Sequence, residues 1–419
     1  MAYFKYLLIT AICIVCFVSC GKEDTEFVLT NNNSVDALEE EIDENANYLN
    51  ESSDYIFDDD KLLTFHLNLA ETALRILDQD PAREEYEEGS LTFEGERVAR
   101  VGIRYKGSIG AFVGCLSGND WINPSGFKTC TKLSMKVKLN WLDKDDTFFG
   151  LKKLQFHSMN HDNSQMRERL GYLLFREMGV PAPRSVHAKL YVNGEYYGLY
   201  ALTEQIDGRF TKFNYDDGSG NLYKEIWPLQ SSGNPWPEDE YISKLKTNED
   251  ENPTAEMIRT FAQDVANASE TDLKSVIEQW MDINEILSYI AVDRTIRNDD
   301  GAFHWYCNQN GCNPHNFFWY EDPTKNRMHL IPWDLDNAFE NIVSNANPVT
   351  PIADGWGEIT NNCQSFSSGA LGARQKSAAC DKLTAAWVSY ENEYADKLEE
   401  FKSGPFSEAR VNNLSLIHI

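Results

Sequence analysis

Alternation of apolar and polar residues recurs through the first half of the chain, and this pattern constrains the fold more than any other feature. The segments LLTFHLNL (62–69) and KLSMKVKLN (132–140) both alternate as half-buried strands do. In the second segment the apolar residues share one face, and the other face carries Lys132, Lys136 and Lys138. We therefore expect a sheet with one buried face.

Two hairpins and a helix extend this β-rich region. Residues 91–107 are typical of a two-stranded hairpin, and residues 187–206 of a second one that turns on an Asn-Gly pair. Between them, helical periodicity predicts a helix with Asp162 as its N-cap and Gly179 as its C-cap.

The second half of the chain has a different pattern. Residues 253–297 are mainly helical in periodicity, 316–322 and 327–336 are typical of two short strands, and another helix is expected near 380–402. A β-rich lobe over about 55–206, followed by a helical lobe over about 207–402, predicts an α+β fold. The tail, residues 403–419, is left outside this domain.

The N-terminus predicts export. The apolar run from Tyr6 to Val18 is too short to span a bilayer comfortably, since about 20 residues are needed. It fits a signal peptide over 1–19, and Ser19-Cys20 at its end resembles a lipoprotein cleavage site. We expect a lipidated Cys20, an acidic tether over 20–54, and a lipoprotein of the outer membrane or cell surface. A soluble secreted protein is the alternative.

Cysteine usage agrees with an oxidising compartment. Three of the nine cysteines lie in the first 20 residues, so six remain in the rest of the chain. An even number outside the cytoplasm indicates disulfides. Fifteen pairings are possible, and the three local ones are preferred because each closes a loop rich in Gly, Asn or Ser. Zinc is the competing interpretation, but the spacing lacks a CxxC or a paired His. The local pairs are Cys115–Cys130, Cys307–Cys312 and Cys363–Cys380.

Charge excludes one class of partner. The chain has 66 acidic and 38 basic residues and a formal net charge of −28. Such a field repels phosphate backbones, so we expect no nucleic-acid partner. An anionic small ligand would need a local basic pocket.

An acidic set in the second half has the composition of a divalent-metal nucleotide site. It comprises NDD (298–300), Asn316 and WDLD (333–336). Mg²⁺ prefers oxygen ligands and usually takes only one or two protein carboxylates. A separate Asp must then orient the attacking hydroxyl. Asp/Asn turns on an acidic surface are the structural alternative.

A basic set lies in the first half. Arg104 and Lys106 precede a loop that contains several glycines and could cover phosphates. A lysine on the following strand could hold nucleotide phosphates if a helix glutamate, Glu168 or Glu177, paired with it. The spacing GxGxxG is absent, and a solvated strand face is the alternative.

These residues also carry a family resemblance. From about Tyr55 to about Tyr390 the chain resembles the CotH family of bacterial spore-coat-type kinases, an atypical protein-kinase-like fold that uses ATP and a divalent metal to phosphorylate Ser or Thr. The segments that match, in order, are RYKGS, KLSMKVKLN, FGLKKLQFHSMNHDNSQMRERLGYLLFREMGVPAPRSVHAKLYVNGEYYGLYALTEQID, NLYK, NDD, HN and IPWDLD.

The resemblance implies roles for basic residues and their partners. Lys138, or else Lys132, corresponds to the phosphate-binding lysine, and Arg104 would help it to position phosphates. Glu168 corresponds to the ion-pair partner of that lysine, and Glu204 to a residue that lines the nucleotide pocket.

It also implies roles for the acidic set. Asp300 corresponds to the catalytic aspartate, with Asp299 as an alternative that spacing does not separate from it. Asn316 and Asp334 correspond to metal ligands, and Asp336 to a second carboxylate ligand. The expected cofactors are ATP with Mg²⁺ or Mn²⁺. The expected substrate is a protein with a Ser or Thr acceptor, and the only membrane contact expected is the lipid anchor. Between Asp300 and Asn316 the chain inserts CNQNGC, where the family usually has a shorter segment.

Other functions fit less well. His157 and His161 have the spacing of a helix-borne zinc pair but lack the adjacent glutamate base. The GxSxG motif of serine hydrolases is absent. A glycosidase would not explain the lysines on the predicted strand. The main rival is non-catalytic, a surface lipoprotein that keeps the fold as a binding or adhesion module, because ATP is scarce outside the inner membrane.

Overall fold

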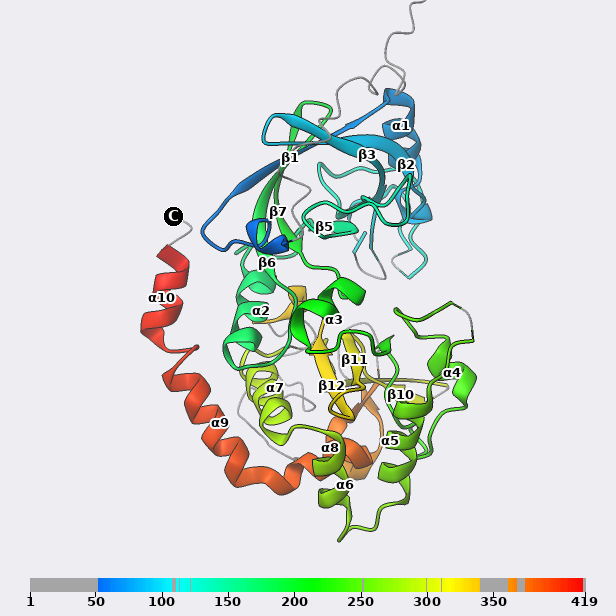
Figure 1. Ribbon diagram of the computed structural model, residues 1–419, viewed down its shortest axis with the longest axis vertical. Coiled ribbons are helices and arrows are strands. Elements are labelled where there is room, and N and C mark those ends of the chain that lie inside the picture. The colour runs from blue at the N-terminus through cyan, green and yellow to red at the C-terminus, as the bar shows by residue number, and fades with distance from the viewer. Residues whose placement is uncertain are drawn as a thin grey trace, which may run out of the picture.

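Seven strands close into a barrel in the N-terminal part of the protein. This computed structural model describes residues 52–107, 111–112, 114–120, 122–250, 252–298, 300–309, 311–339, 361–367 and 374–416. The predicted signal peptide, Cys20, most of the tether, part of the glycine-containing loop, and Asp299 lie outside the described residues. The barrel is at the top of Figure 1, in the strand order β1-β2-β3-β4-β5-β7-β6. Its strands are β1 (Leu63–Leu69), β2 (Glu87–Phe93), β3 (Glu96–Tyr105), β4 (Met135–Lys138), β5 (Lys153–His157), β6 (Ser185–Val192) and β7 (Glu195–Thr203).

The alternating pattern has the predicted effect in this barrel. Met135 and Val137 of β4 are fully buried in its core, and the lysines between and beyond them point outward. Parallel pairing of β1 with β6 closes the ring, and all other neighbours are antiparallel. The β6–β7 hairpin turns at Asn193 and Gly194, which both have positive φ, as a two-residue turn of this kind requires.

Helix α2 (Arg167–Glu177) connects the barrel to the rest of the protein (Figure 1). It begins later than the sequence predicts, because its N-cap is Met166 and not Asp162. The Asp162 carboxylate still accepts a hydrogen bond from the Arg167 N–H at 2.9 Å, so it serves the first turn from a distance. The C-cap is Met178 and not the predicted Gly179, which follows it in the left-handed conformation at φ +77°.

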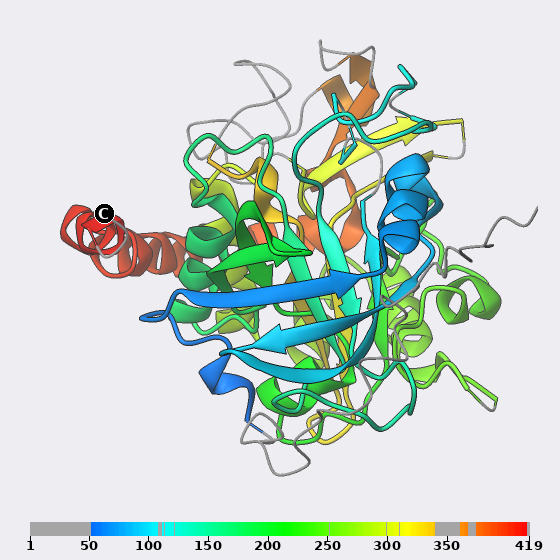
Figure 2. The same cartoon turned by 90° about the horizontal axis from the view of Figure 1, so that it is seen from above.

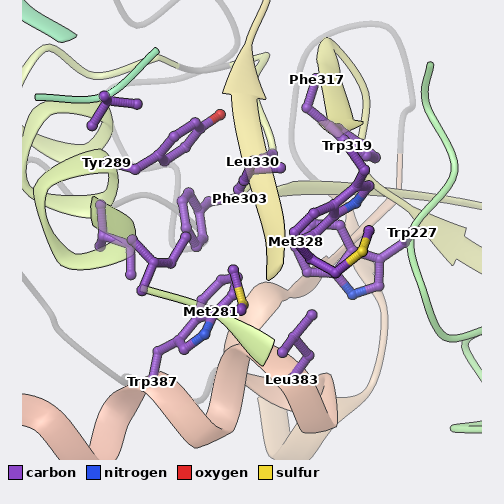
Figure 3. Close-up of a cluster of buried hydrophobic side chains, with 14 of the residues drawn as sticks. Trp227, Met281, Tyr289, Phe303, Phe317, Trp319, Met328, Leu330, Leu383 and Trp387 are labelled. Atoms are coloured by element: carbon purple, nitrogen blue, oxygen red, sulfur yellow. The ribbon is translucent and has the colours of Figure 1, made fainter. Parts of the chain in front are cut away.

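The C-terminal part has a three-stranded sheet with helices packed around it. The sheet has the order β12-β11-β8 and contributes to a large apolar core. Trp227 has edge-on contacts in this core with Phe317, Trp319 and Trp387, which Figure 3 labels, and also with Trp305. The sheet strands are β8 (Leu222–Lys224), β11 (Phe317–Asp322) and β12 (Arg327–Pro332). Besides α2, the α-helices in the described residues are α1 (Glu71–Gln79), α3 (Gly208–Asn214), α4 (Glu238–Ile242), α5 (Glu256–Asn267), α6 (Leu273–Trp280), α7 (Ile283–Thr295), α8 (Lys382–Trp387), α9 (Glu391–Ser403) and α10 (Glu408–Leu416).

A second sheet of four strands carries two of the three disulfides. It has the order β10-β9-β14-β13, and the preferred local pairing of all six cysteines is confirmed. One disulfide joins β9 to β10, and another joins the loop before β13 to the segment after β14. The strands are β9 (His304–Asn308), β10 (Gly311–Asn313), β13 (Phe366–Ser367) and β14 (Arg374–Ser377).

The structure confirms a mixed α+β fold. The predicted strands at 316–322 and 327–336 are β11 and β12, and the predicted helical region 253–297 contains α5, α6 and α7. Seen from above (Figure 2), α9 and α10 extend to one side of the barrel, and α10 lies in the tail that the sequence analysis left aside. None of the helices in the described ranges has the length and apolar character needed to cross a membrane.

The barrel core generates a stability prediction. Phe65 is fully buried, with its ring centroid 4.9 Å from that of Phe93 and 5.3 Å from that of Phe156. Phe65→Ala should lower the free energy of unfolding by about 3–5 kcal/mol through lost burial and the cavity left behind. Phe127→Ala, at a ring that is 59% exposed, should change it by about 0.5 kcal/mol or less. Urea denaturation of both variants measures this, and similar losses would contradict the barrel core described here.

Candidate functional site

A buried chain of three side chains lies where the barrel meets α2. Lys106 follows β3, His157 ends β5, and Glu168 is in the first turn of α2. The Lys106 ammonium is 2.7 Å from His157 Nε2, and His157 Nδ1 is 2.7 Å from Glu168 Oε1. A histidine therefore bridges the lysine and the glutamate. Burial lowers the pKa of Lys106, and the Asp334 and Glu168 charges oppose that shift.

Two aspartates follow the last strand of the three-stranded sheet. Asp334 has left-handed backbone angles, φ 58° and ψ 60°, and its N–H donates to the Tyr172 hydroxyl of α2 at 2.9 Å. Asp336 lies in a short 3-10 turn, Leu335–Asn337, and its carbonyl accepts from Arg167 at 3.0 Å. Non-glycine residues in this conformation cluster at functional sites. Two residues near the start of α2, Arg167 and Tyr172, therefore hold the segment that contains both aspartates.

A third aspartate lies opposite, before β9. Asn316 joins it to the sheet: its side-chain amide N–H₂ donates to Asp300 Oδ2 and to the Asp300 carbonyl, each at 3.0 Å. The Trp333 N–H in turn donates to the Asn316 carbonyl at 3.1 Å. Because the Asn316 nitrogen is used in this way, its side-chain oxygen is the atom left for a cation.

Burial and mutual repulsion set the charge states of these aspartates. Burial raises the pKa of Asp300 to about 7, and the Asp334 charge adds to the shift while hydrogen bonds from Tyr306 and Asn316 oppose it. Burial also raises the pKa of Asp334, against the attraction of Lys106. The pKa of Asp336 is raised well above its usual range by burial and by the Asp334, Glu168 and Asp300 charges. Each of these carboxyl groups is therefore protonated more readily than a free aspartate, and a bound cation would favour its charged form.

A second lysine lies on the barrel side. Lys136 of β4 pairs in register with Arg104 on one side and Gln155 on the other. Within the described part of the chain its ammonium has no hydrogen-bonded or ion-paired partner. Burial, together with repulsion from Lys153, Lys106 and Arg104, lowers the pKa of Lys136 to about 7, and Asp207 opposes the shift.

The remaining predicted residues lie elsewhere or have other partners. Lys132 donates to the Leu199 carbonyl at 2.7 Å. The ammonium of Lys138 lies over the Trp141 ring, 5.6 Å from its centroid.

Glu204 is buried in an ion pair with Arg184, with a shortest N–O distance of 2.6 Å. Arg104 forms an ion pair with Glu84 at 2.8 Å, although its charge reaches Lys136.

Lys132, Lys138 and Glu204 therefore do not join the aspartates. Lys106 bonds to Ser134 through its backbone, and Lys138 is four residues further along β4, about 13 Å for an extended strand.

Three side chains at the site, those of His157, Tyr172 and Tyr306, are not indicated as site residues by the sequence. His157 and His161 have the spacing of a helix-borne zinc pair, but His157 ends a strand and His161 lies in the turn beyond. The alternation in KLQFH indicated a strand there, and that signal could have separated the two histidines. Nothing in the sequence pattern marked the two tyrosines.

The oxygen atoms of these side chains are more typical of a metal coordinated jointly by protein and ligand than of one coordinated by protein groups alone. Among the described residues, no group of three or more His, Cys, Asp or Glu side chains is arranged to hold a metal ion. Mg²⁺ at nucleotide sites usually takes one or two carboxylates and completes its shell with phosphate oxygens and water. Asp334, Asp336 and the Asn316 oxygen are ligands of the type that such a site uses.

Comparison with known proteins identifies the family of this chain. The sequence model of the family described as CotH kinase protein matches residues 103–414. The chain belongs to this family. The CotH match begins within β3 and ends within α10, so it includes Lys106, His157, Glu168 and the three aspartates.

Two CotH relatives are similar over part of their length. The inner spore coat protein H of Bacillus subtilis is 24% identical over 201 residues, which are 45% of this chain and 51% of the relative. Invasin CotH2 of Rhizopus delemar is 25% identical over 248 residues, 54% of this chain and 39% of the relative. The chain thus spans about half or less of the curated relatives it matches.

Lys136 generates a pH prediction. Its pKa in the folded protein lies below the ordinary value of 10.5, so the charged form is disfavoured by folding. Below pH 7 the folded protein carries the full free-energy cost of the buried ammonium. This cost disappears as the pH rises toward 10.5, because the folded protein releases the proton at a lower pH than the unfolded chain does. Lys136→Met should therefore raise the free energy of unfolding at pH 6 by about 1–3 kcal/mol, and the gain should shrink by pH 9.

Chemical denaturation at both pH values measures this difference. Lys138→Met, two residues along the same strand, is the matched control for removal of one positive charge from β4. Parallel stability curves for wild type and Lys136→Met across this pH range would contradict the environment described for Lys136.

Proposed function

We propose that this CotH protein is an extracytoplasmic atypical protein kinase that transfers the γ-phosphate of ATP to a Ser or Thr of a surface protein. The observation that supports this best is the meeting of cations and carboxylates from separate elements. Lys106 comes from the barrel, Asp334 and Asp336 follow β12, and Asp300 with Asn316 flanks the β9–β10 hairpin. A kinase-like arrangement of two lobes about this site belongs to the same proposal.

The cationic side would bind the phosphates. Lys106 is held by His157 and Glu168, so its ammonium is fixed in position before a ligand arrives. Lys136 lacks a counterion among the described residues and lies within the electrostatic reach of Lys106. A triphosphate between them would restore a full positive charge to Lys136, because a nearby anion favours the protonated form.

The aspartates and Asn316 would position the metal ion and the acceptor hydroxyl for transfer. Asp334 and Asp336, with the Asn316 oxygen, would hold Mg²⁺ or Mn²⁺, which when bound neutralises charge on the phosphates. Asp300 would orient the acceptor hydroxyl and accept its proton as the oxygen bonds to the γ-phosphorus. The bond between that phosphorus and the β,γ-bridging oxygen breaks, and ADP leaves. Positioning and charge stabilisation account for such a rate gain without covalent catalysis.

Location is part of the proposal. Three disulfides are typical of an oxidising compartment, and a spore coat relative is named for a surface structure. We place the protein outside the cytoplasm, anchored through lipidated Cys20 at the outer membrane or cell surface, with a surface protein as its acceptor.

A non-catalytic binding or adhesion module is the second candidate. The names of the two relatives, a coat protein and an invasin, favour it. The electrostatic interaction of Lys106 with Asp334 and the hydrogen bond from Asn316 to Asp300 favour the kinase, because a module without phosphate chemistry gains nothing from burying these charges.

Nucleotide binding is tested by comparing two lysines. With ATP and Mn²⁺ at 100 times the Kd, the wild-type protein should gain about 2.7 kcal/mol of stability. Lys106→Met should weaken ATP binding about tenfold or more, as one charge-assisted contact to a phosphate is lost. Lys138→Met should bind ATP as the wild type does, because Lys138 lies over Trp141. Thermal melting with a titration of ATP measures both, and the reverse ranking would favour the role that the family resemblance implied for Lys138.

Transfer is tested by comparing two aspartates. Asp300→Asn should abolish phosphate transfer but keep the ATP-induced melting shift, since Asp300 would act on the acceptor. Asp334→Asn should lose both, since it would hold the metal. Mass spectrometry after incubation with ATP and a Ser-containing acceptor measures transfer, including self-modification, and Asp145→Asn, with a carboxylate that is 77% exposed, is the control. A melting shift without transfer in the wild type would indicate a nucleotide-binding pseudoenzyme, and no shift at all would favour the binding module.

A further inference from the structure

The segment before the barrel, residues 53–61, is attached to the protein at several points, and we call it the strap. It precedes β1 and begins with the short turn Ser53–Tyr55, in the darkest blue in Figure 1. Ile56 and Phe57 are buried in the barrel core. The family match begins at residue 103, so the strap lies outside the part of the chain that it covers. A role for the strap must therefore come from its contacts in this chain.

Asp59 of the strap contacts helix α2. Its carbonyl accepts a hydrogen bond from the Arg169 guanidinium at 2.7 Å. Its carboxylate is 3.6 Å from the same guanidinium and 3.9 Å from that of Arg176, two turns further along the helix. The Arg169 side chain is only 8% exposed. A buried charge is costly without hydrogen-bonded partners, so Asp59 helps to fix Arg169 in this position.

This contact lies in the turn of α2 that organises the site. Arg167 donates to the Asp336 carbonyl at 3.0 Å. Glu168 supports Lys106 through a histidine. Arg169 is the next residue, so three consecutive residues connect α2 to the aspartate segment, to the barrel lysine and to the strap. A shift of Arg169 would move Glu168 with it, because the two residues share one helical turn.

Arg184, directly before β6, holds the other end of the strap. Its guanidinium donates to Ser53 Oγ at 2.7 Å and to Asp54 Oδ1 at 2.9 Å. The same guanidinium lies over the Phe57 ring, 4.6 Å from its centroid. Its buried ion pair with Glu204, directly after β7, orients it for these contacts. The strap is thus fixed at its start by the barrel and near its end by α2.

We propose that the strap is part of the phosphate-binding apparatus, and that Asp59 is a positioning residue for Glu168 and, through it, for Lys106. This inference rests on the proposed function and adds a way in which the same site is regulated. The strap continues from the acidic tether predicted over 20–54. Displacement of the strap from α2 would release Arg169, and ATP would then bind more weakly.

A charge reversal tests the contact. Asp59→Lys places a cation beside two arginines, so it should displace the strap from α2. The Asp59 side chain is 45% exposed, which leaves the new ammonium in water and the fold intact. The Kd for ATP with Mn²⁺ should rise about threefold or more, measured by titration calorimetry. Asp58→Lys is the matched control and should keep the wild-type Kd, because the Asp58 carboxylate pairs with Lys61 at 3.1 Å, within the strap.

A double-mutant cycle tests whether the strap acts through Glu168. Glu168→Gln should weaken ATP binding by itself. Adding Asp59→Lys to it should raise the Kd little further, because both changes act on Lys106 through one chain of contacts. A strap that only stabilises the fold would lower the free energy of unfolding without this coupling.

Hydrogen exchange tests the strap in the absence of ATP. The backbone amides of residues 170–174 in α2 should exchange faster in Asp59→Lys than in the wild type, since the helix loses an external contact. Asp58→Lys should show the wild-type exchange rates.

The outcomes separate this inference from the proposed function. An unchanged Kd in Asp59→Lys, in a protein whose wild type binds ATP, would overturn the inference alone. Fold-changes that multiply in the double variant would overturn the route through Glu168, and unchanged exchange in α2 would overturn the attachment of the strap to this helix. Wild-type protein that binds no ATP would overturn the proposed function, and the role of the strap in binding with it.

Discussion

The site depends on an imbalance of buried charge. Asp300, Asp334 and Asp336 lie close enough to act on one another electrostatically, and the cation that reaches Asp334 most strongly is Lys106. Burying like charges together costs stability unless a counterion compensates them. The carboxylates that raise one another's pKa are also the groups best able to bind a divalent cation. Lys136 has the opposite problem, because Lys153, Lys106 and Arg104 repel its ammonium. A metal-bound triphosphate is a ligand that would satisfy both sides at once.

Helix α2 explains why the two parts of the fold present these groups to each other. Glu168 supports Lys106 through His157 of the barrel. One turn further, Tyr172 accepts from the Asp334 N–H, and Arg167 donates to the Asp336 carbonyl. One short helix thus holds the barrel lysine and the aspartate segment relative to each other. A small apolar cluster that includes Ile206, Phe210 and Trp333 lies beside the same junction.

Whether a feature could be predicted from the sequence depends on how far apart along the chain its interacting residues lie. Burial of alternate side chains is local, so β1, β4 and the β6–β7 hairpin could be located from the sequence, as could the three short-range disulfides. The identity of the lysine that approaches Asp334 is not local. It depends on the register of β3 against β4, which brings Lys106 to Ser134 and leaves Lys138 over Trp141. The β9–β10 hairpin beside Asp300 has strands of only five and three residues. Periodicity is too short there to indicate a fold, and the aspartates were found through their motif and not through their contacts.

The parallel contact between β1 and β6 has a further consequence for a protein that would work among many others at high density. An open sheet offers a row of free N–H and C=O groups to which a foreign strand can add. Here the first strand of the barrel meets the sixth, and the ring has no terminal strand to donate such a template. The barrel can therefore present its surface to neighbouring chains without recruiting them through backbone pairing, and any association through the barrel would come from its side chains.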